Sequence, residues 1–212
     1  TIRIDKRLPL GGGLGGGSSD AATALVALNH YWGTGLALAD LAELGLRLGA
    51  DVPVFVRGRA AWAEGVGERL TPVDLDEPWF VVLTPPCHVA TGAVFADPEL
   101  TRNSPPLTIA DLTPSGGGND CEAVVYRRFP EVAAAAAWLA RHGRARLTGT
   151  GACVFAAFPD RASAGRTLDQ LPPGWAGFVA RGRNRSPLRE RLSREHAAPP
   201  EASPNFWVVA KR

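Results

Sequence analysis

The sequence predicts an α+β fold, on three observations. Segments with helical periodicity alternate with short apolar runs of strand character, unlike the regular repeats of a parallel doubly wound sheet. The 212 residues suffice for one large or two small domains. Apolar residues make up 45% and charged residues 21%, which is the composition of a globular protein and excludes a wholly disordered chain.

The chain is expected to begin with a short strand at residues 1–4, where two isoleucines alternate with polar residues. A loop follows in which six of the seven residues from 11 to 17 are glycine. Residues 18–20 are Ser, Ser and Asp, all good helix N-caps, so we expect a helix to begin there and to end before Gly33. The glycine loop therefore leads directly into a helix.

The rest of the chain continues the alternation. A second helix is expected over residues 38–48, with Gly49 as its stop. Alternating valines predict a strand over 52–56, and a turn then leads to a second strand over 60–65. Further strands are expected over 79–83, 145–148, 153–158 and 177–180, and further helices over 91–95, 119–128, 130–141 and 160–171.

The C-terminal end is basic in a chain whose net charge is +2. From Arg181 to Arg212 there are eight Lys or Arg against three Asp or Glu. Such a tail can contact nucleic acid or a membrane surface, and it is also typical of a solvated extension. We favour the extension and expect no nucleic-acid partner, because aromatic residues are not interleaved with the arginines as stacking platforms require.

The cysteines argue for a reducing compartment. Cys87, Cys121 and Cys153 are odd in number and lack metal-ligand spacing, so we predict free thiols in a cytoplasmic protein and no protein-built metal site. No apolar run approaches the roughly 18 residues of a membrane span, so no membrane partner is expected. The chain has no methionine and begins within an expected strand, from which we expect the natural N-terminus to lie further upstream.

The glycine loop has the properties of a phosphate cradle. Its backbone N–H groups are unobstructed, and the following helix start carries about half a positive charge. The hydroxyls of Ser18 and Ser19 can donate to phosphate oxygens or bind Mg²⁺. The loop is neither a Walker A motif nor a convincing dinucleotide fingerprint. A flexible linker is the alternative, although a linker is rarely followed by three capping residues and an amphipathic helix.

Three segments in order resemble the GHMP kinases, a superfamily of small-molecule kinases. They are PLGGGLGGGSSDAA at 9–22, GADVPVF at 49–55 and LTGTGACVFA at 147–156. Within this superfamily, the sequence is similar to the branch that phosphorylates 4-diphosphocytidyl-2-C-methyl-D-erythritol, in the methylerythritol phosphate route to isoprenoid precursors. The segments that carry this similarity are LGADVPVFVRGRAAWAEGVGE, NDCE at 119–122 and RNRSPL at 183–188. The resemblance covers about residues 1–188.

The resemblance implies a GHMP kinase fold of two domains with the active site in the cleft between them. Residues 1–70 are then the remainder of an ATP-binding domain of the ribosomal protein S5 domain 2 type, with its first strands missing. Residues 71–187 form a ferredoxin-like substrate domain. The basic tail at 188–212 lies beyond the resemblance and its composition suggests disorder, although 205–211 could add a strand.

The implied cofactors are ATP and Mg²⁺. The expected ATP-binding residues are Lys6, Pro9, Gly11, Gly12, Gly13, Gly15, Gly16, Gly17, Ser18 and Ser19. Asp51 is expected to be the catalytic residue and to contact the substrate, because a carboxylate can accept the proton of the reacting hydroxyl. The alternative for Asp51 is that it caps a turn. The family also carries an upstream lysine that pairs with this aspartate.

The implied substrate residues are Thr91 and Phe95, in the segment that contacts the cytidine nucleotide, and the second glycine turn at Gly149, Thr150 and Gly151. A core position for Phe95 and a plain turn at 149–151 are the alternatives. Asp120 and Glu122 could hold Mg²⁺, but acidic residues also favour a helix N-terminus, so no metal ligand is assigned.

The function implied is transfer of the γ-phosphoryl group of ATP to a hydroxyl of the methylerythritol part of that substrate. Two alternatives stand beside it: a different GHMP kinase, such as a homoserine or mevalonate kinase, and an inactive nucleotide-binding remnant lacking the upstream lysine. The expected partner is a small molecule, and the expected state is a monomer or a weak homodimer.

Overall fold

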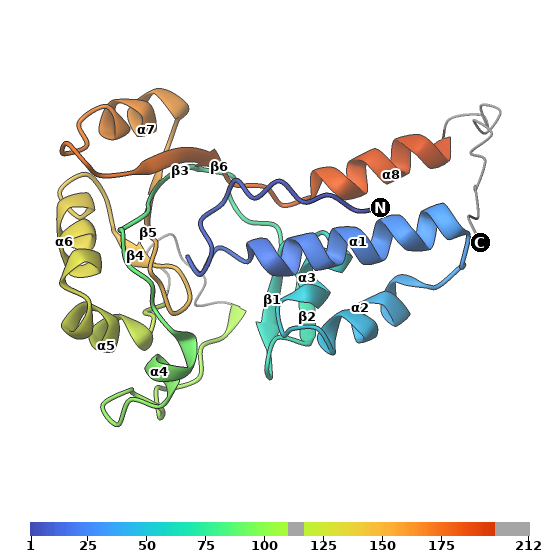
Figure 1. Ribbon diagram of the computed structural model, residues 1–212, viewed down its shortest axis with the longest axis horizontal. Coiled ribbons are helices and arrows are strands. Elements are labelled where there is room, and N and C mark those ends of the chain that lie inside the picture. The colour runs from blue at the N-terminus through green and yellow to red at the C-terminus, as the bar shows by residue number, and fades with distance from the viewer. Residues whose placement is uncertain (110–116, 198–212) are drawn as a thin grey trace, which may run out of the picture.

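Two separate apolar clusters organise the computed structural model, which describes residues 1–109 and 117–197 (Figure 1). The first cluster holds together α1 (Gly16–Trp32), α2 (Leu38–Leu46), α3 (Val52–Arg57) and α8 (Pro187–Ala197). A hairpin of β1 (Ala61–Glu64) and β2 (Arg69–Pro72) belongs to the same half of the molecule.

The second cluster lies under a four-stranded antiparallel sheet. Its strands are β3 (Trp79–Leu83), β4 (Arg146–Leu147), β5 (Val154–Phe158) and β6 (Gly177–Arg181), in the order β4-β5-β3-β6. Four helices belong to this half, namely α4 (Thr91–Phe95), α5 (Cys121–Arg128), α6 (Pro130–Leu139) and α7 (Arg161–Leu168). Helices and antiparallel strands together confirm the α+β class.

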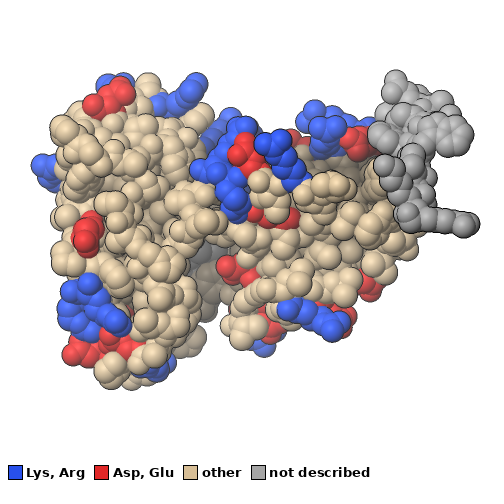
Figure 2. Space-filling model, viewed as in Figure 1, with Lys and Arg blue, Asp and Glu red and all other residues tan. Residues whose placement is uncertain are grey.

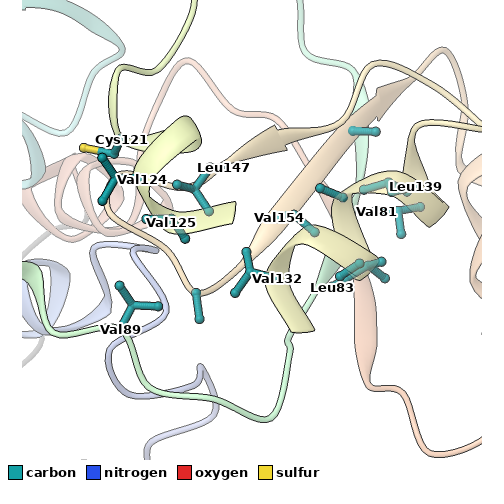
Figure 3. Close-up of a cluster of buried hydrophobic side chains, with 14 of the residues drawn as sticks. Val81, Leu83, Val89, Cys121, Val124, Val125, Val132, Leu139, Leu147 and Val154 are labelled. Carbon is teal, nitrogen blue, oxygen red and sulfur yellow. The ribbon is translucent and has the colours of Figure 1, made fainter. Parts of the chain in front are cut away.

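Alternate side chains of β3 pack one face of the sheet against the helices. Val81 and Leu83 of β3 face the helices, where Val125 of α5 and Leu139 of α6 are fully buried (Figure 3). Burying a side chain of this size is worth about 1.5–3 kcal/mol. Leu147 of β4 and Val154 of β5 are buried in the same cluster, which positions the turn that joins these two strands.

The prediction of a strand over 52–56 is wrong, because these residues form α3. Val52 and Val56, one turn apart, are buried against the first cluster, and Pro53 stands in the first helical turn, where proline is tolerated. Gly58 ends the helix in the left-handed conformation. Tertiary packing therefore overrides the strand preference of valine, and β1 pairs instead with β2, which the sequence pattern did not reveal.

The predicted strand at 1–4 is also wrong. Ile2 and Ile4 are 61% and 57% exposed, and within the described residues this segment pairs with no strand. By contrast, the strand at 79–83 and the short helix at 91–95 are confirmed with the expected bounds.

Of the tail at 188–212, whose composition suggests disorder, residues 188–197 are helical and belong to α8, while residues 198–212 lie outside the described residues. Leu192 is 8% exposed and packs in the first cluster with α1 and α2. The chain reaches α8 along residues 58–60, since Ser186 N donates to Gly58 O at 3.0 Å and Ala60 N to Asn184 O at 2.8 Å. The strand considered for 205–211 lies outside the described residues. Among the described helices none is long and apolar enough to cross a membrane.

Candidate functional site

The helix α1 begins without a side-chain cap. Its N-cap is Gly15, in the left-handed conformation, and no side chain accepts a hydrogen bond from the first turn. Residues 18–20, expected to be caps, lie inside the helix instead. A helix start leaves its first N–H groups without an intrahelical partner, so those of Gly16, Gly17 and Ser18 are available to an anion.

The open side of this helix start is at Gly17. A methyl group added to Gly17 would meet no atom within 4 Å, and one added to Gly16 would lie 3.7 Å from Lys6 Nζ. Lys6 Nζ also pairs with Asp20 Oδ2 at 2.5 Å, which holds the lysine beside the first turn of α1. The start of α1 therefore combines open space at Gly17, N–H groups without an intrahelical partner and the nearby cation of Lys6. The side chain of Arg7, by contrast, is 87% exposed and pairs with Asp5.

The other loop glycines are required by packing within the protein. A methyl group on Gly13 would lie 2.3 Å from Thr148 O, and one on Gly12 would lie 2.7 Å from Cys153 Sγ and 3.1 Å from Pro9 Cγ. Gly11 and Gly13 also have φ near +70°, which glycine adopts without strain. The first half of the loop is thus shaped by the second glycine turn, while its second half is open.

Thr148 makes the contact between the two glycine segments. Its buried hydroxyl donates to Gly12 O at 2.6 Å, and Cys153 O lies 2.8 Å from the same hydroxyl. Cys153 N also donates to Gly12 O at 3.4 Å. Sequence reasoning missed Thr148, although its place inside LTGTG, next to Gly149, was the signal that could have found it.

The N-terminus of α5 holds the second glycine turn. Asn119 Nδ2 donates to Gly149 O at 2.6 Å and lies 3.3 Å from Leu147 O. Glu122 Oε1 accepts from Leu147 N at 2.9 Å, so this carboxylate is engaged with the backbone of β4. Asp120 accepts from Ser104 Oγ at 2.8 Å. The NDCE segment therefore supports the turn.

Asp51 lies exposed at the start of α3, without a side-chain cap hydrogen bond. One helical turn further on, the ring of Phe55 lies against the N-cap of α1, 2.8 Å from the position of a Cβ on Gly15. Residues four apart share a helix face, so Asp51 and Phe55 are on the side of α3 that meets the start of α1. The carboxylate of Asp51 is therefore exposed on that side of α3 and makes no capping hydrogen bond.

Thr91 and the second glycine turn are in direct contact. The hydroxyls of Thr91 and Thr150 lie 2.9 Å apart, which joins the first residue of α4 to the turn. Gly149 and Gly151 have φ of +45° and +87° and shape this turn. Phe95 is 56% exposed at the other end of α4, which excludes a core position for its ring. A continuous series of contacts therefore runs from α4 through the two glycine segments to α3.

The surface is indented between the two halves of the molecule, as Figure 2 shows. Two further pockets lie elsewhere. One of about 330 Å³ is enclosed by the end of β3, α6 and Trp175, and one of about 360 Å³ by α1, α2 and α8. Neither is lined by a residue of the glycine segments, so neither belongs to the candidate site.

The surroundings of Cys87 and Cys153, the thiols near the glycine loop, lower their reactivity. Burial raises the pKa of Cys153 to about 11, and burial also raises the pKa of Cys87. A thiol in this state is a poor nucleophile at neutral pH. Within the described residues, no group of three or more His, Cys, Asp or Glu side chains is placed to hold a metal ion.

Comparison with known proteins identifies both halves. Residues 1–59 match the model of the GHMP kinases N terminal domain, and residues 100–175 match the GHMP kinases C terminal model. The chain is 56% identical over 195 residues to the 4-diphosphocytidyl-2-C-methyl-D-erythritol kinase of Halorhodospira halophila, which covers 91% of the chain and 68% of that relative. It is 59% identical over 191 residues to the enzyme of that name from Ectopseudomonas mendocina, covering 90% and 66%.

Solved structures agree with these matches. A crystal structure of a 4-(cytidine 5′-diphospho)-2C-methyl-D-erythritol kinase superimposes with a TM-score of 0.73 at 32% identity, over 84% of this chain and 69% of that one. A homoserine kinase from Cytophaga hutchinsonii superimposes with a TM-score of 0.55 at 16% identity, over 85% and 69%, which shows a shared fold alone. The chain spans about two thirds of the length of the relatives it matches.

Proposed function

This chain belongs to the GHMP kinases, within the family of the 4-diphosphocytidyl-2-C-methyl-D-erythritol kinases, and on that basis we propose its reaction and the roles of its residues. The protein transfers the γ-phosphoryl group of ATP to a hydroxyl of the methylerythritol part of 4-diphosphocytidyl-2-C-methyl-D-erythritol. The O–P bond to the new acceptor forms as the bond to the ADP oxygen breaks, and the hydroxyl proton is lost.

The observation that carries this proposal is the uncapped, open start of α1. Its first N–H groups have no intrahelical or side-chain partner, and the space beside Gly17 is unfilled. Such a helix start attracts phosphate through both hydrogen bonds and the helix dipole. We assign the triphosphate to Gly15, Gly16, Gly17 and the hydroxyls of Ser18 and Ser19, with Lys6 adding positive charge and Pro9 to Gly13 shaping the loop.

Asp51 is the proposed catalytic residue. Phosphoryl transfer depends mainly on positioning and charge neutralisation, and the protein must also accept the hydroxyl proton. The Asp51 carboxylate is exposed and lies on the side of α3 that faces the start of α1, where it is free of a capping bond. A carboxylate in this place can accept the proton while the N–H groups of α1 hold the phosphates.

Thr91, Phe95 and the turn from Gly149 to Gly151 form the proposed acceptor side of the site. The exposed ring of Phe95 offers a face for stacking on a base. We accordingly assign nucleotide binding to residues 1–70 and acceptor binding to residues 71–187. The phosphoryl transfer would take place on the open side of the loop, at Gly15 to Gly17, and the buried hydrogen bond between Thr148 and Gly12 joins the two parts beside it.

Mg²⁺ fits this site as an ion held chiefly by the phosphates. Magnesium commonly binds one or two protein oxygens together with substrate phosphates and water, so a preformed cluster of carboxylates is unnecessary. The hydroxyls of Ser18 and Ser19, in the first turns of α1, and the carboxylate of Asp51 are the protein oxygens that we assign to the ion. When bound, the ion neutralises charge on the phosphates. The three free cysteines suit the reducing cytoplasm, which we retain as the proposed location.

A substrate panel tests the proposal. ADP release is measured with 4-diphosphocytidyl-2-C-methyl-D-erythritol, homoserine and mevalonate as acceptors, each with ATP and Mg²⁺. We expect turnover with the cytidine compound alone. Turnover with homoserine or mevalonate would place the chain elsewhere in the superfamily, and ATP binding without turnover on any acceptor would mean that this chain is a nucleotide-binding protein without kinase activity.

A further inference from the structure

Asp97, immediately after α4, stands out by its burial. Its side chain is 8% exposed, and within residues 1–109 and 117–197 it is the one buried side chain that carries a charge. Burying a carboxylate is costly unless it is paired and hydrogen-bonded. No step of the proposed reaction uses Asp97, so its burial needs another explanation.

Two arginines from the last turn of α5 pair with this carboxylate. Arg127 Nη2 donates to Asp97 Oδ1 at 3.1 Å, and Arg128 Nη1 lies 3.3 Å from Asp97 Oδ2. The backbone N–H of Glu99 also donates to Oδ1, at 3.0 Å. Arg127 forms a second ion pair with Glu99. The carboxylate is therefore fully engaged from two sides.

The arginines around Asp97 also bind the backbone of α4. Arg128 Nη1 donates to Ala93 O at 3.1 Å. Arg102 Nη2 donates to Phe95 O at 2.7 Å and lies 3.0 Å from Asp97 O. Ala93 and Phe95 belong to α4, and the last carbonyl groups of a helix have no partner within it. Asp97 O, just beyond the helix, also accepts from Leu100 N at 3.2 Å. At the other end of the helix, Thr91 contacts Thr150.

A helix of five residues is too short to be stable by itself. Val94 is fully buried in the second cluster, while the next residue, Phe95, is exposed. Buried ion pairs seldom add net stability over apolar packing, and their better-supported role is to select one conformation. The arginine contacts to Ala93 O and Phe95 O hold the C-terminal end of this short helix in one orientation.

We propose that Asp97, Arg127 and Arg128 are positioning residues that set the affinity of the protein for its cytidine-bearing acceptor, by holding α4 so that Thr91 and Phe95 meet it. This inference rests on the proposed function, since it assigns α4 to the acceptor side. It predicts an effect on the acceptor alone, because none of the three contacts the glycine loop or Lys6.

The test is steady-state kinetics of Arg128→Ala and Asp97→Asn, with both substrates varied. We expect KM for 4-diphosphocytidyl-2-C-methyl-D-erythritol to rise about tenfold or more, the loss that one charge-assisted hydrogen bond produces. KM for ATP should stay within about twofold of the wild-type value, because the substitutions leave the contacts to ATP unchanged. Arg128→Lys keeps the charge but loses the planar fork, so it should fall between Ala and wild type.

Arg144→Ala is the matched control, an exposed arginine in the turn before β4, and both KM values should match those of the wild type. If Arg128→Ala moves both KM values together, or neither, the inference is overturned. Hydrogen exchange supplies a readout that does not need activity. The amides of Ala93, Val94, Ala96 and Asp97, which bond within α4 and its end, should exchange faster in Arg128→Ala while those of β3 and β5 do not.

The two proposals fail in different ways. A wild-type protein that does not phosphorylate the cytidine compound contradicts the proposed function, and hydrogen exchange then decides the inference. Unchanged exchange across residues 93–97 in Arg128→Ala would show that the arginines do not hold α4. Loss of the folded state in that variant, seen by circular dichroism, transfers the kinetic test to Arg128→Lys and Asp97→Asn.

Discussion

The hydroxyl of Thr148 lies 2.6 Å from the carbonyl oxygen of Gly12, a residue 136 positions earlier in the chain. This hydrogen bond joins the turn between β4 and β5 to the loop that precedes α1. A buried bond between the two halves makes the geometry of the phosphate loop depend on the second half of the molecule.

Replacing Thr148 by Val should weaken both stability and ATP binding. Val has nearly the same shape, but it leaves Gly12 O with the long bond from Cys153 N alone, at a cost of about 1–3 kcal/mol. KM for ATP should rise because the loop loses its support. Thermal unfolding and ATP kinetics check this. Thr167→Val, at a buried threonine of α7, is the control and should change stability without changing KM for ATP.

Gly17→Ala should stabilise the fold of the protein while weakening its binding of ATP. Gly17 lies in the first turn of α1 with open space around it, and alanine is favoured over glycine in a helix by about 1 kcal/mol. Its methyl group would occupy the space proposed for a phosphate, so KM for ATP should rise at least tenfold. Denaturant unfolding and ADP-release kinetics measure the two effects. An unchanged KM for ATP would move the triphosphate away from this helix start.

Gly13→Ala should destabilise the folded protein, whereas Gly17→Ala should stabilise it. Its methyl group would collide with Thr148 O at 2.3 Å, in a backbone conformation that alanine avoids. We expect loss of more than about 2 kcal/mol of stability. A lower midpoint of urea unfolding checks this, and a variant as stable as wild type would contradict the close packing of the two glycine segments.

Asp51→Asn should lower kcat about 100-fold or more and leave ATP binding intact, since general base catalysis contributes factors of that size. Binding of a non-hydrolysable ATP analogue provides the second measurement. Asp169→Asn, at an exposed aspartate that follows α7, is the control. Near-normal turnover in Asp51→Asn would remove this carboxylate from the chemistry.

Thiol labelling should distinguish the three cysteines. Cys87 is half-buried, whereas Cys121 and Cys153 are buried, so an aromatic disulfide reagent should modify Cys87 first. Burial raises the pKa of Cys87, so the fraction of reactive thiolate, and with it the rate, should still be increasing at about pH 9. Cys87→Ser removes the fast phase. A rate that levels off below neutral pH would contradict the direction of the shift.

The sequence was most informative where local pattern and burial agree. The apolar run of β3 and the segment of α4 were predicted with their bounds. The glycine loop was recognised because its composition is extreme. The alternating valines of residues 52–56 led to a wrong prediction of a strand, because packing against α1 makes this segment the helix α3. The start of α1 was misplaced because three capping residues follow a glycine cap that has no side chain.

The contacts that build the site could not be predicted from local patterns. Thr148 meets Gly12, and Asn119 meets Gly149, across long stretches of chain, and nothing in their neighbours encodes the partner. The same holds for Asp97, whose two arginines lie 30 and 31 residues away. Such pairs arise only when the sheet and its helices bring the segments together.

The burial of Leu192 against α1 and α2 has a consequence for synthesis on the ribosome. The helices that contain residues 16–57 are made early, yet the side chain that completes their apolar cluster emerges when nearly all of the described chain has been translated. Until then the first half exposes an unfinished surface, and it is open to chaperones and to aggregation. Pausing late in translation should therefore prolong this vulnerable period, whereas pausing after residue 197 has cleared the exit tunnel should not.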